Sequence, residues 1–534
     1  MKRALLSVSD KTGLVDIAKI LITSGYDILS TGGTLKELQK AKIQATSVED
    51  VTGFPECFGG RVKTMHPLIM GGILFNREIP EHVAEAKKLG IEPIDLVVVN
   101  LYPFADTVRK LGASSGISLE AIEQIDIGGP TLLRSAAKNH SAVTVVCDPS
   151  DYEEVGSQIQ KNGSTTSDLR ARLAAKVFAH TAAYDGMISQ YLSGGKNISL
   201  SLTNGRTLRY GENPHQWGKF YAIDSSLHSC GHSVSGEAMS SELRAMSNST
   251  QSSKLKAQSW SQLQGKELSY LNILDSDACW RMVCEFSAPT CVMVKHANPS
   301  GIASAATLEE AFQNAYDSDR LSAFGVIISL NRPCTEVIAK KILDQKIFVE
   351  VILAPEYESG ALELLKSKPN IRLLSMDSVS FSDNILYRSA FGGMLVQNDD
   401  VKEITEADLT CVTKAKPTKK QIADLLFAWK VVKHAKSNAI VLVKDATTIG
   451  IGCGQTSRVD STWIALKRAG DKAKGSVLAS DAFFPFPDSI EEAAKHGIAA
   501  VIQPGGSIRD SEVFAKADAL GIAMVTTSVR AFRH

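Results

Sequence analysis

The chain has 534 residues, of which 44% are hydrophobic and 22% are charged, a composition typical of a soluble globular protein that is too long for one hydrophobic core. Its formal net charge of zero argues against a general affinity for nucleic acid or an anionic membrane, so an anionic ligand must be held by a local site. Nine scattered cysteines without a Cys-x-x-Cys pair favour a reducing compartment and argue against a disulfide framework or a zinc knuckle. No hydrophobic run approaches the roughly 20 residues of a membrane span, and the first residues do not resemble a signal peptide, so we expect a soluble cytoplasmic protein.

Short hydrophobic strands alternate with amphipathic helices over the first third of the chain. We expect strands at 4–8, 26–29, 94–100 and 143–147, and helices over 14–24, from about Leu35, and over the segment that carries Arg134, Lys138, Asn139 and His140. The run Ile94–Asn100 is almost continuously hydrophobic, which is typical of a parallel strand covered on both faces. The alternation predicts a Rossmann-like α/β domain with a parallel sheet, which we extend over residues 1–198.

Polar residues follow several of these strands, and ligands of open α/β sheets bind at the carboxyl edge of the strands. At Ser30–Thr34 a glycine-rich turn between strand and helix would present backbone N–H groups to an anion, although a plain turn explains the same residues. Hydroxyl donors at Ser30, Thr31 and Thr34 would assist. Neither a Walker lysine nor a Gly-x-Gly-x-x-Gly sequence supports a nucleoside triphosphate or dinucleotide site here.

The other candidate residues of this first site are mostly cationic. They are Lys11, Arg61, Lys63 and Lys138, together with the carboxylate of Asp126 and the phenol of Tyr102. Such a set suits a small phosphorylated metabolite. Lys138 and Asp126 are too far apart in the sequence to share one helical turn, so they could meet only through the fold.

Residues 199–534 contain two series of strands and helices in similar order, about 199–395 and 396–534, which predicts a duplicated α/β unit, although we see no clear sequence repeat. Residues 224–261 are rich in serine and poor in large hydrophobic residues, and we interpret them as a flexible insertion.

A lysine and a histidine, Lys295 and His296, follow the hydrophobic strand 288–294. We expect Asn298–Gly301 to turn the chain after them. Rigid strand ends beside open loops are common places for chemistry, and a neighbouring cation favours the neutral, basic imidazole. A solvated lysine next to a hydrogen-bonded histidine is the plainer interpretation.

Two further segments allow two interpretations each. Glu350 interrupts the hydrophobic run 347–354, so it is either paired or functional, or it faces water on an edge strand. The segment Asp481–Asp488 holds three phenylalanines and two prolines, which suits stacking on a flat heteroaromatic ligand or, equally, local hydrophobic packing.

Taken together, these segments resemble the family in which AICAR transformylase is joined to IMP cyclohydrolase. The cyclohydrolase-like motifs are Ser7–Lys11, Ser30–Thr34, Arg61–Thr64, Asn100–Phe104, Ile125–Gly129 and Ala137–His140. The transformylase-like motifs are Arg209–Gln216, Lys295–Pro299, Ser322–Gly325, Gly450–Gly452, Gly454–Gln455, Ser457–Arg458, Asp481–Phe486 and Gln503–Ser507. They cover nearly the whole chain in the family's order. Ser300 stands where the family usually has Cys.

The resemblance implies a bifunctional enzyme for the last two steps of IMP biosynthesis. A formyl group would pass from 10-formyltetrahydrofolate, as co-substrate, to AICAR, and the product FAICAR would then close its ring with loss of water to give IMP. The implied fold is a methylglyoxal-synthase-like N-terminal domain followed by duplicated cytidine-deaminase-like subdomains without zinc. The implied assembly is a homodimer that needs no metal, nucleic acid or membrane.

The resemblance also assigns roles to residues. For formyl transfer His296 would remove the proton of the amine, Lys295 would keep His296 basic and stabilise the oxyanion, and Asn438 would hold the formyl oxygen. For ring closure Lys63, Tyr102, Asp126 and Lys138 would position the formyl oxygen and shuttle protons. The implied substrate-binding residues are Ser9, Lys11, Ser30, Thr31, Gly32, Gly33, Thr34, Arg61 and Thr64, and in the later part Arg209, Tyr210, His215, Asn272, Phe324, Gly325, Glu350, Arg458, Phe483, Pro485, Phe486, Asp488, Arg530 and Phe532.

Two other classes of protein would share part of this pattern. A nucleotide-binding regulator of the methylglyoxal-synthase-like type would use Ser30–Thr34 with an inactive C-terminal part, but it would need neither His296 nor Asn438. A zinc-dependent deaminase would need ligand spacing that the sequence lacks.

Overall fold

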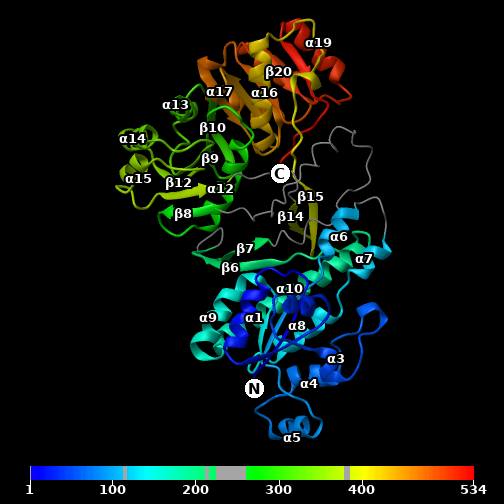
Figure 1. Cartoon of the computed structure of the whole chain (residues 1–534). Coiled ribbons are helices and arrows are strands. Elements are labelled where there is room, and N and C mark those ends of the chain that lie inside the picture. The colour runs from blue at the N-terminus through cyan, green and yellow to red at the C-terminus, as the bar shows by residue number, and fades with distance from the viewer. Residues whose placement is uncertain (1, 112–116, 211–215, 224–259, 378–384) are drawn as a thin grey trace. The chain divides into compact units, whose positions relative to one another are not determined.

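The computed structural model describes residues 2–111, 117–210, 216–223, 260–377 and 385–534, which divide into two compact units (Figure 1). The first unit holds the chain up to Asn204 with Tyr221 and its described neighbours, and the second holds Gly205–Phe220 and the chain from Trp260 onward. The serine-rich insertion and His215 lie outside the described residues, except that Trp260 and Ser261 begin a strand.

The first unit is built on a five-stranded sheet in the order β3-β2-β1-β4-β5, and every pairing in it is parallel. Its strands are β1 (Lys2–Val8), β2 (Tyr26–Ser30), β3 (Thr46–Ser47), β4 (Leu96–Asn100) and β5 (Thr144–Val146). The strands β1, β2 and β4 are mostly buried, as expected for strands covered on both faces. The predicted parallel sheet is confirmed.

Helices cover both faces of this sheet. They are α1 (Leu14–Thr23), α2 (Gly32–Lys40), α3 (Val48–Thr52), α4 (Pro67–Leu74), α5 (Pro80–Lys88), α6 (Phe104–Leu111), α7 (Leu119–Glu123), α8 (Gly128–Lys138), α9 (Tyr152–Asn162) and α10 (Ser167–Leu192). Helix α2 begins at Gly32 rather than near Leu35, because the extended Thr31 is its N-cap and both glycines lie in its first turn. Helix α8 ends at Lys138, so Asn139 and His140 lie beyond it.

The second unit contains a twelve-stranded sheet in the order β16-β21-β20-β19-β17-β18-β10-β9-β11-β12-β13-β8. Its first half contributes β8 (Trp260–Gln264), β9 (Thr290–Lys295), β10 (Asn298–Ser304), β11 (Val326–Leu330), β12 (Val349–Ala354) and β13 (Arg372–Met376). Its second half contributes β16 (Thr410–Cys411), β17 (Ile440–Lys444), β18 (Thr447–Gly452), β19 (Val477–Ser480), β20 (Ala500–Gln503) and β21 (Ala523–Thr526). Read outward from the β18–β10 pair, both halves have the same order and the same parallel and antiparallel pairings.

The helices repeat in the same way. The first half has α12 (Tyr270–Val283), α13 (Leu308–Ser318), α14 (Glu336–Asp344) and α15 (Ser359–Leu365), and the second has α16 (Lys419–His434), α17 (Arg458–Ala469), α18 (Asp488–Lys495) and α19 (Asp510–Leu520). Each half therefore runs helix, hairpin, helix, strand, helix, strand, helix, strand, and the predicted duplication is confirmed. Two hairpins stand apart from the sheet: β6 (Leu202–Leu208) with β7 (Gly218–Ile223), and β14 (Ile385–Ala390) with β15 (Gly393–Asn398).

Close packing of the central hairpins also repeats. A Cβ atom added to Gly301 in β10 would lie 2.1 Å from the carbonyl oxygen of Ala315 in α13, and one added to Gly450 in β18 would lie 2.1 Å from that of Ala465 in α17. Only glycine permits this approach of strand to helix.

The duplication carries a sequence repeat that the sequence analysis missed. Ser269, Asn272, Asp275, Trp280 and Lys295 recur as Thr418, Gln421, Asp424, Trp429 and Lys444, at one constant offset (418 − 269 = 149 and 444 − 295 = 149). Both starting serine or threonine residues form capping boxes with the residue three positions later. The repeat was hard to see because the residues between these positions differ.

The chain turns at His296–Ala297, not at Asn298–Gly301 as predicted. Both turn residues have positive φ, 53° and 57°, the pattern of a two-residue hairpin turn, and Asn298 already begins β10. Pro299 and Gly301 mark an irregularity within that strand rather than a break. In the second half Asp445–Ala446 forms the same turn, with φ of 53° and 50°.

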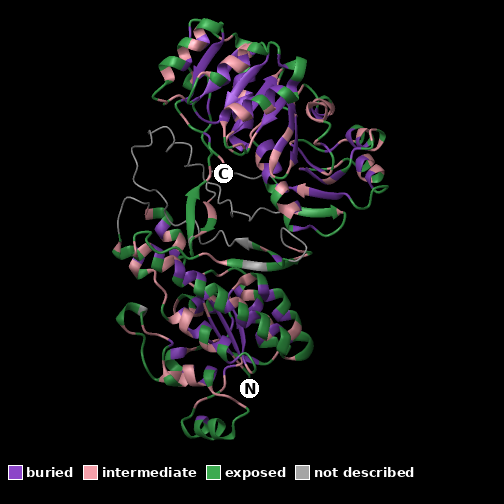
Figure 2. Cartoon of the chain, turned by 180° about the vertical axis from the view of Figure 1, so that it is seen from behind, coloured by how far each residue is buried: buried purple, intermediate pink, exposed green. Residues whose placement is uncertain are grey.

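The central strands of the two large sheets form the buried interior, whereas the helices expose their outer faces (Figure 2). Among the described helices, none combines the length and the hydrophobicity needed to cross a bilayer.

Candidate functional site

The first candidate site lies at the carboxyl edge of the five-stranded sheet. Asn100, the last residue of β4, accepts hydrogen bonds at Oδ1 from the backbone N–H groups of Ser9 at 2.5 Å and Asp10 at 2.8 Å. Its Nδ2 donates in return to the carbonyl oxygen of Asp10 at 3.0 Å. The loop that carries Ser9 and Lys11 is thereby tied to the strand that leads to Tyr102.

Two of the predicted phosphate donors are used by the fold itself. The Ser30 hydroxyl donates to the carbonyl oxygen of Leu6 at 2.8 Å. The Thr34 Oγ1 bonds both the N–H and the carbonyl oxygen of Val8, each at 3.0 Å. Both side chains are buried. Their hydrogen bonds join β2 and α2 to β1. The first turn of α2, at Gly32 and Gly33, is the part of this segment that remains for an anion.

The cations of the site differ in their surroundings. The Lys63 ammonium lies 3.5 Å from the Cβ position of Gly32, and pairs with Glu56 at 3.4 Å. Lys11 donates to the carbonyl oxygens of Val8 and Ser9. Burial lowers the pKa of Lys11, although Glu37 and Asp10 oppose this effect. Arg61 is exposed and pairs with Glu123.

Asp126 lies just before α8 and accepts a hydrogen bond from the N–H of Gly129 at 2.8 Å. Burial raises the pKa of Asp126, whereas the N–H groups of Gly129 and Tyr102 and the charge of Lys63 lower it. Thr64 lies close by, with Oγ1 3.6 Å from the Cβ position of Gly128. The fold therefore brings Lys63, Thr64, Tyr102 and Asp126 together, and Tyr102 remains 41% exposed.

Lys138 does not join this group within one chain. It is the last residue of α8, whereas Asp126 lies just before the first. The eleven residues of α8 span about 16 Å, and the helix leads back to the start of β5 at the opposite edge of the sheet.

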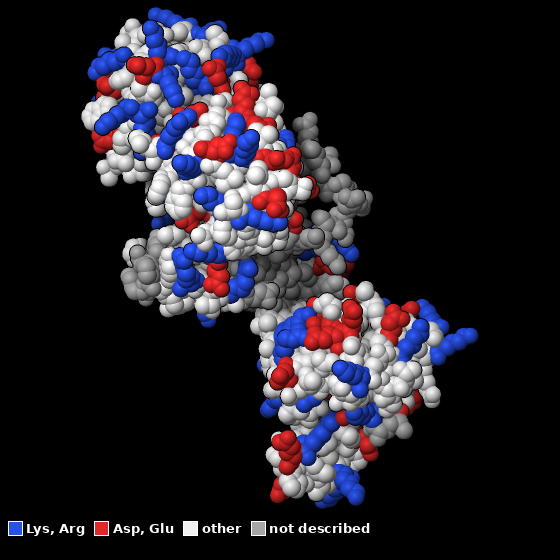
Figure 3. Space-filling model, turned by 90° about the vertical axis from the view of Figure 1, so that its left-hand side faces the viewer, with Lys and Arg blue, Asp and Glu red and all other residues white. Residues whose placement is uncertain are grey.

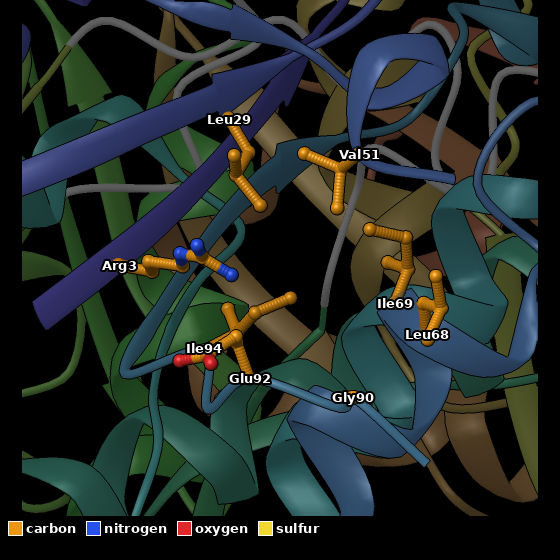
Figure 4. Close-up of a pocket in the computed structure, with 8 residues that line it drawn as sticks. All are labelled: Arg3, Leu29, Val51, Leu68, Ile69, Gly90, Glu92 and Ile94. Atoms are coloured by element: carbon orange, nitrogen blue, oxygen red, sulfur yellow. The ribbon is translucent and has the colours of Figure 1, made fainter. Parts of the chain in front are cut away.

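Two cavities lie away from the predicted residues. One of about 280 Å³ lies in the first unit, where Figure 4 shows Arg3 and Leu29 on one side and Val51 and Ile69 on the other. The other, of about 490 Å³, flanks the Asp445–Ala446 turn of the second unit and is lined partly by Lys444 and Lys472. Neither cavity is lined by a predicted catalytic residue.

The second candidate site lies at the His296–Ala297 turn, in the middle of the twelve-stranded sheet. His296 is exposed at the turn, and the preceding residue Lys295 ends β9. The Lys295 ammonium donates to the carbonyl oxygens of Phe324 and Gly325. Gly325 has φ of 69°, and a Cβ atom there would lie 3.2 Å from Lys295 Nζ. The loop after α13 therefore fixes the ammonium of the residue that precedes His296.

A short chain of contacts connects this turn to Asn438. The side chain of Asn298 donates from Nδ2 to the carbonyl oxygen of His296 at 3.1 Å, and accepts at Oδ1 from the N–H of Lys436 at 3.1 Å. Asn438 follows two residues later. The two halves of the duplicated unit thus contribute His296 and Asn438 to the same place.

Asn438 is oriented by a buried ion pair. Arg458 donates from Nη2 to Asn438 Oδ1 at 2.7 Å and from Nη1 to the hydroxyl of Ser480 at 2.9 Å and to Asp481. Asp481 is fully buried. With its oxygen bound, Asn438 presents Nδ2, which donates to the carbonyl oxygens of Gln455 at 3.0 Å and Thr456 at 3.2 Å. Arg458, predicted to bind substrate, therefore lies behind Asn438.

The C-terminal segment is fastened next to Asn438. Ser437 donates from its N–H to the carbonyl oxygen of Arg533 at 2.8 Å, and its hydroxyl accepts from the N–H of Arg533 at 3.2 Å. The guanidinium of Arg533 donates to His434 Nδ1 at 3.1 Å. These contacts bring Arg530, which lies 4.5 Å over the ring of Phe532, to this part of the unit.

The aromatic segment Asp481–Asp488 satisfies both interpretations of its sequence. Phe484 is fully buried in the core, whereas Phe483 and Phe486 are 37% and 48% exposed. Pro485 and Asp488 are exposed as well, and Arg509 lies 4.7 Å over the ring of Phe486. Exposed rings of this kind are available for stacking.

Other predicted binding residues already have partners in the fold. Glu350 pairs with the buried Arg372 at 2.7 Å, and β12 lies between β11 and β13, so the interpretation as an edge strand is wrong. Asn272 is buried and completes the capping box of α12. Arg209 stacks over Tyr210 and donates to its hydroxyl at 2.7 Å.

Asp275 is a site residue that the sequence analysis missed. It lies on α12, and its Oδ1 accepts a hydrogen bond from the N–H of Ala297 at 2.8 Å. The repeat of Asp275 at Asp424 was the available signal.

The described part of the chain shows neither a surface patch of one charge on the face seen in Figure 3 nor a cluster of metal ligands. Basic and acidic side chains are interspersed on the face seen in Figure 3. Within the described ranges, no group of three or more His, Cys, Asp or Glu side chains is arranged to hold a metal ion.

Comparison with known proteins identifies relatives of the whole chain. A family model described as AICARFT/IMPCHase bienzyme matches residues 136–468, more than half of the chain, and one described as an MGS-like domain matches residues 13–131. A protein from Bacillus thuringiensis subsp. konkukian named bifunctional purine biosynthesis protein PurH is 47% identical, with 100% of both chains covered. A protein of the same name from Bacillus cereus (strain AH820) is 48% identical with the same coverage.

One solved structure, described as ForH, is 33% identical and covers 37% of this chain and 100% of its own, with a TM-score of 0.34. The matches to the family models and to the full-length relatives confirm the resemblance found in the sequence. The chain belongs to the AICARFT/IMPCHase bienzyme family.

Proposed function

We propose how this bifunctional enzyme of purine biosynthesis, an AICAR transformylase and IMP cyclohydrolase, divides its two reactions between its two units. The second unit would transfer the formyl group to AICAR, and the first would close the ring of FAICAR. Support comes from the separation of the two clusters: His296 and Asn438 lie in the second unit, whereas Lys63, Tyr102 and Asp126 lie in the first.

For formyl transfer, the contact that carries the proposal is the bridge made by Asn298 between His296 and Lys436. This bridge joins His296, the proposed base, to the loop that carries Asn438. The amine of AICAR is a weak nucleophile because its lone pair is spread into the imidazole ring, so its proton must leave as the C–N bond forms. The His296 imidazole would take that proton, the fixed ammonium of Lys295 would stabilise the oxyanion, and Asn438 Nδ2 would hold the formyl oxygen in exchange for one of its present contacts with Gln455 and Thr456. The bond between the formyl carbon and N10 of the folate would then break, and the proton on His296 would pass to N10 of the leaving tetrahydrofolate.

For ring closure, the supporting observation is that a carboxyl, an ammonium and a phenol lie together around Asp126. Its pKa is raised by burial, and an ammonium at Lys63 and a phenol at Tyr102 lie nearby. Groups of this kind can give and take the protons that are exchanged when the amide nitrogen attacks the formyl carbon and water leaves. The first turn of α2 would bind the phosphate. Lys138 would contribute from a second copy of the chain.

The co-substrate would be 10-formyltetrahydrofolate, with its ring system against the exposed Phe483 and Phe486.

We place the enzyme in the cytoplasm as a homodimer. The hairpin β14–β15 exposes Phe391 at its turn and Met394 and Leu395 on β15, which a second copy would cover.

The test of the function is an assay of the purified chain with AICAR and 10-formyltetrahydrofolate, following IMP and free tetrahydrofolate. Both products are expected in equal amounts. A chain that binds nucleotide but forms neither product would instead be a regulator with an inactive C-terminal part.

A further inference from the structure

The hairpin that carries His296 is held in place by Asp275. The carboxylate accepts a hydrogen bond from the N–H of Ala297 at 2.8 Å, and the N–H of His296 also bonds to it. Both turn residues have positive φ, 53° and 57°, a conformation that residues with a Cβ atom adopt at a cost. A carboxylate that accepts from two successive N–H groups favours this turn over its alternatives.

The second half of the unit contains the same arrangement without a histidine. Asp424 accepts from the N–H of Ala446 at 2.8 Å through Oδ1 and from that of Asp445 at 3.2 Å through Oδ2. The helix position, the turn and the φ angles correspond, and only the residue presented by the turn differs. A carboxylate at this helix position that accepts from the central hairpin turn is therefore a feature of both halves, and in the first half that turn presents His296.

We propose that Asp275 is a positioning residue for formyl transfer, which fixes the imidazole of His296 through the two backbone N–H groups of the His296–Ala297 turn. This inference rests on the proposed role of His296. Asp275 itself takes no proton from the substrate: the proton passes from the amine to the imidazole as the amine nitrogen bonds to the formyl carbon, and then to N10 of the folate as the bond between N10 and the formyl carbon breaks. Loss of the carboxylate would let the turn relax, so that the imidazole spends less time in line with the amine.

The charges around Asp275 agree with this assignment. Burial raises the pKa of Asp275, whereas the N–H group of Ala297 and the charges of His296 and Lys295 lower it. A carboxylate here also complements the cationic imidazole that would form when His296 takes the proton.

The test compares Asp275→Asn with the matched control Asp424→Asn, both in the full-length enzyme. Asparagine keeps one acceptor oxygen but replaces the other with a donating NH2 group and removes the charge, so each variant weakens one hairpin by the same chemical change. For Asp275→Asn we expect kcat for formyl transfer to fall about 10-fold, with the KM for AICAR within about threefold and FAICAR cyclisation unchanged. For Asp424→Asn we expect a similar fall in melting temperature with kcat for transfer nearly retained.

Two outcomes would overturn the proposal: an unchanged kcat in Asp275→Asn, or an equal loss of kcat in both variants, which would mean a general effect of hairpin stability. The variant His296→Ala separates this result from the proposed function. If His296→Ala retains formyl transfer, the proposed role of His296 as the base is wrong. If His296→Ala loses transfer while Asp275→Asn keeps it, only the positioning role is wrong. The double variant should be no slower than His296→Ala alone, because Asp275 acts through His296.

Discussion

Arg458 donates a hydrogen bond from Nη2 to Oδ1 of Asn438 at 2.7 Å. The other nitrogen of the same guanidinium binds the fully buried Asp481. One planar cation thus neutralises a buried carboxylate and fixes the orientation of the Asn438 amide, whose Nδ2 donates to the carbonyl oxygens of Gln455 and Thr456.

This geometry predicts that Arg458→Lys impairs formyl transfer. A lysine ammonium can still pair with Asp481, but it cannot span both Asp481 and Asn438 in the guanidinium geometry. We expect kcat for transfer to fall on the order of 10-fold or more while FAICAR cyclisation is unchanged. Steady-state assays of both reactions check this, and a normal transfer rate in a protein that lacks Arg458 would show that Asn438 needs no such support.

Ring closure should remain in the first unit when the second is removed. A fragment that ends near residue 198 contains the five-stranded sheet with its helices and the cluster of Lys63, Tyr102 and Asp126. We expect the dimeric form of this fragment, in which a second copy supplies Lys138, to convert FAICAR to IMP and to leave 10-formyltetrahydrofolate untouched. Absence of cyclisation in a fragment that is dimeric and has a cooperative thermal melt would refute the division of the reactions between the units.

The position of Lys138 predicts complementation between two inactive variants. Lys63→Ala and Lys138→Ala should each lose cyclisation but keep formyl transfer. If a partner supplies Lys138, mixing and re-associating the two variants should restore about a quarter of the wild-type cyclisation, because half of the dimers are mixed and each has one intact site. No recovery in verified mixed dimers would place both lysines in the same subunit's site or remove Lys138 from it.

A buried cluster beside the C-terminal segment should make the second unit sensitive to acid. Burial alone would raise the pKa of Glu285, but His434 and Lys433 outweigh it and lower the pKa from 4.5 to about 2. A carboxyl whose pKa is lowered in the folded state contributes stability above its unfolded pKa and loses it as the pH falls towards the folded value. Burial lowers the pKa of His434, so the neutral ring donates from Nε2 to Glu285 at 3.0 Å and accepts from Arg533.

Glu285→Gln should therefore be less stable than the wild type by about 2–3 kcal/mol at neutral pH, and the difference should shrink between about pH 5 and pH 2. Chemical denaturation at several pH values measures it. A stability difference that does not change with pH over this range would contradict the ion-pair account.

The sequence predicted the parallel sheet, the duplicated unit and the surroundings of Lys295 because these depend on hydrophobic runs and on residue types at strand ends. It placed the central turn wrongly because Pro299 and Gly301 are ordinary turn formers, whereas the positive φ angles belong to His296 and Ala297, which give no such signal. The turn is imposed by tertiary contacts, among them the one from Asp275.

Several predicted binding residues also have partners within the fold, because one residue type can serve two purposes. Ser30 and Thr34 have the hydroxyl groups of a phosphate site, yet those hydroxyls bond the backbone of β1. Glu350 looked available for a ligand because Arg372, its partner, is distant in the sequence. Lys138 matches a family motif, but helix length alone keeps it from Asp126.

The most direct test of the central claim is His296→Ala assayed for both reactions, alongside a thermal melt. We expect a normal melt and normal FAICAR cyclisation, with formyl transfer slowed on the order of 10²–10⁴-fold, the range for loss of a general base. Retained transfer in the folded variant would contradict the assignment of His296 as the base. A loss of both reactions together with a lowered melting temperature would contradict it equally, because it would make His296 a structural residue.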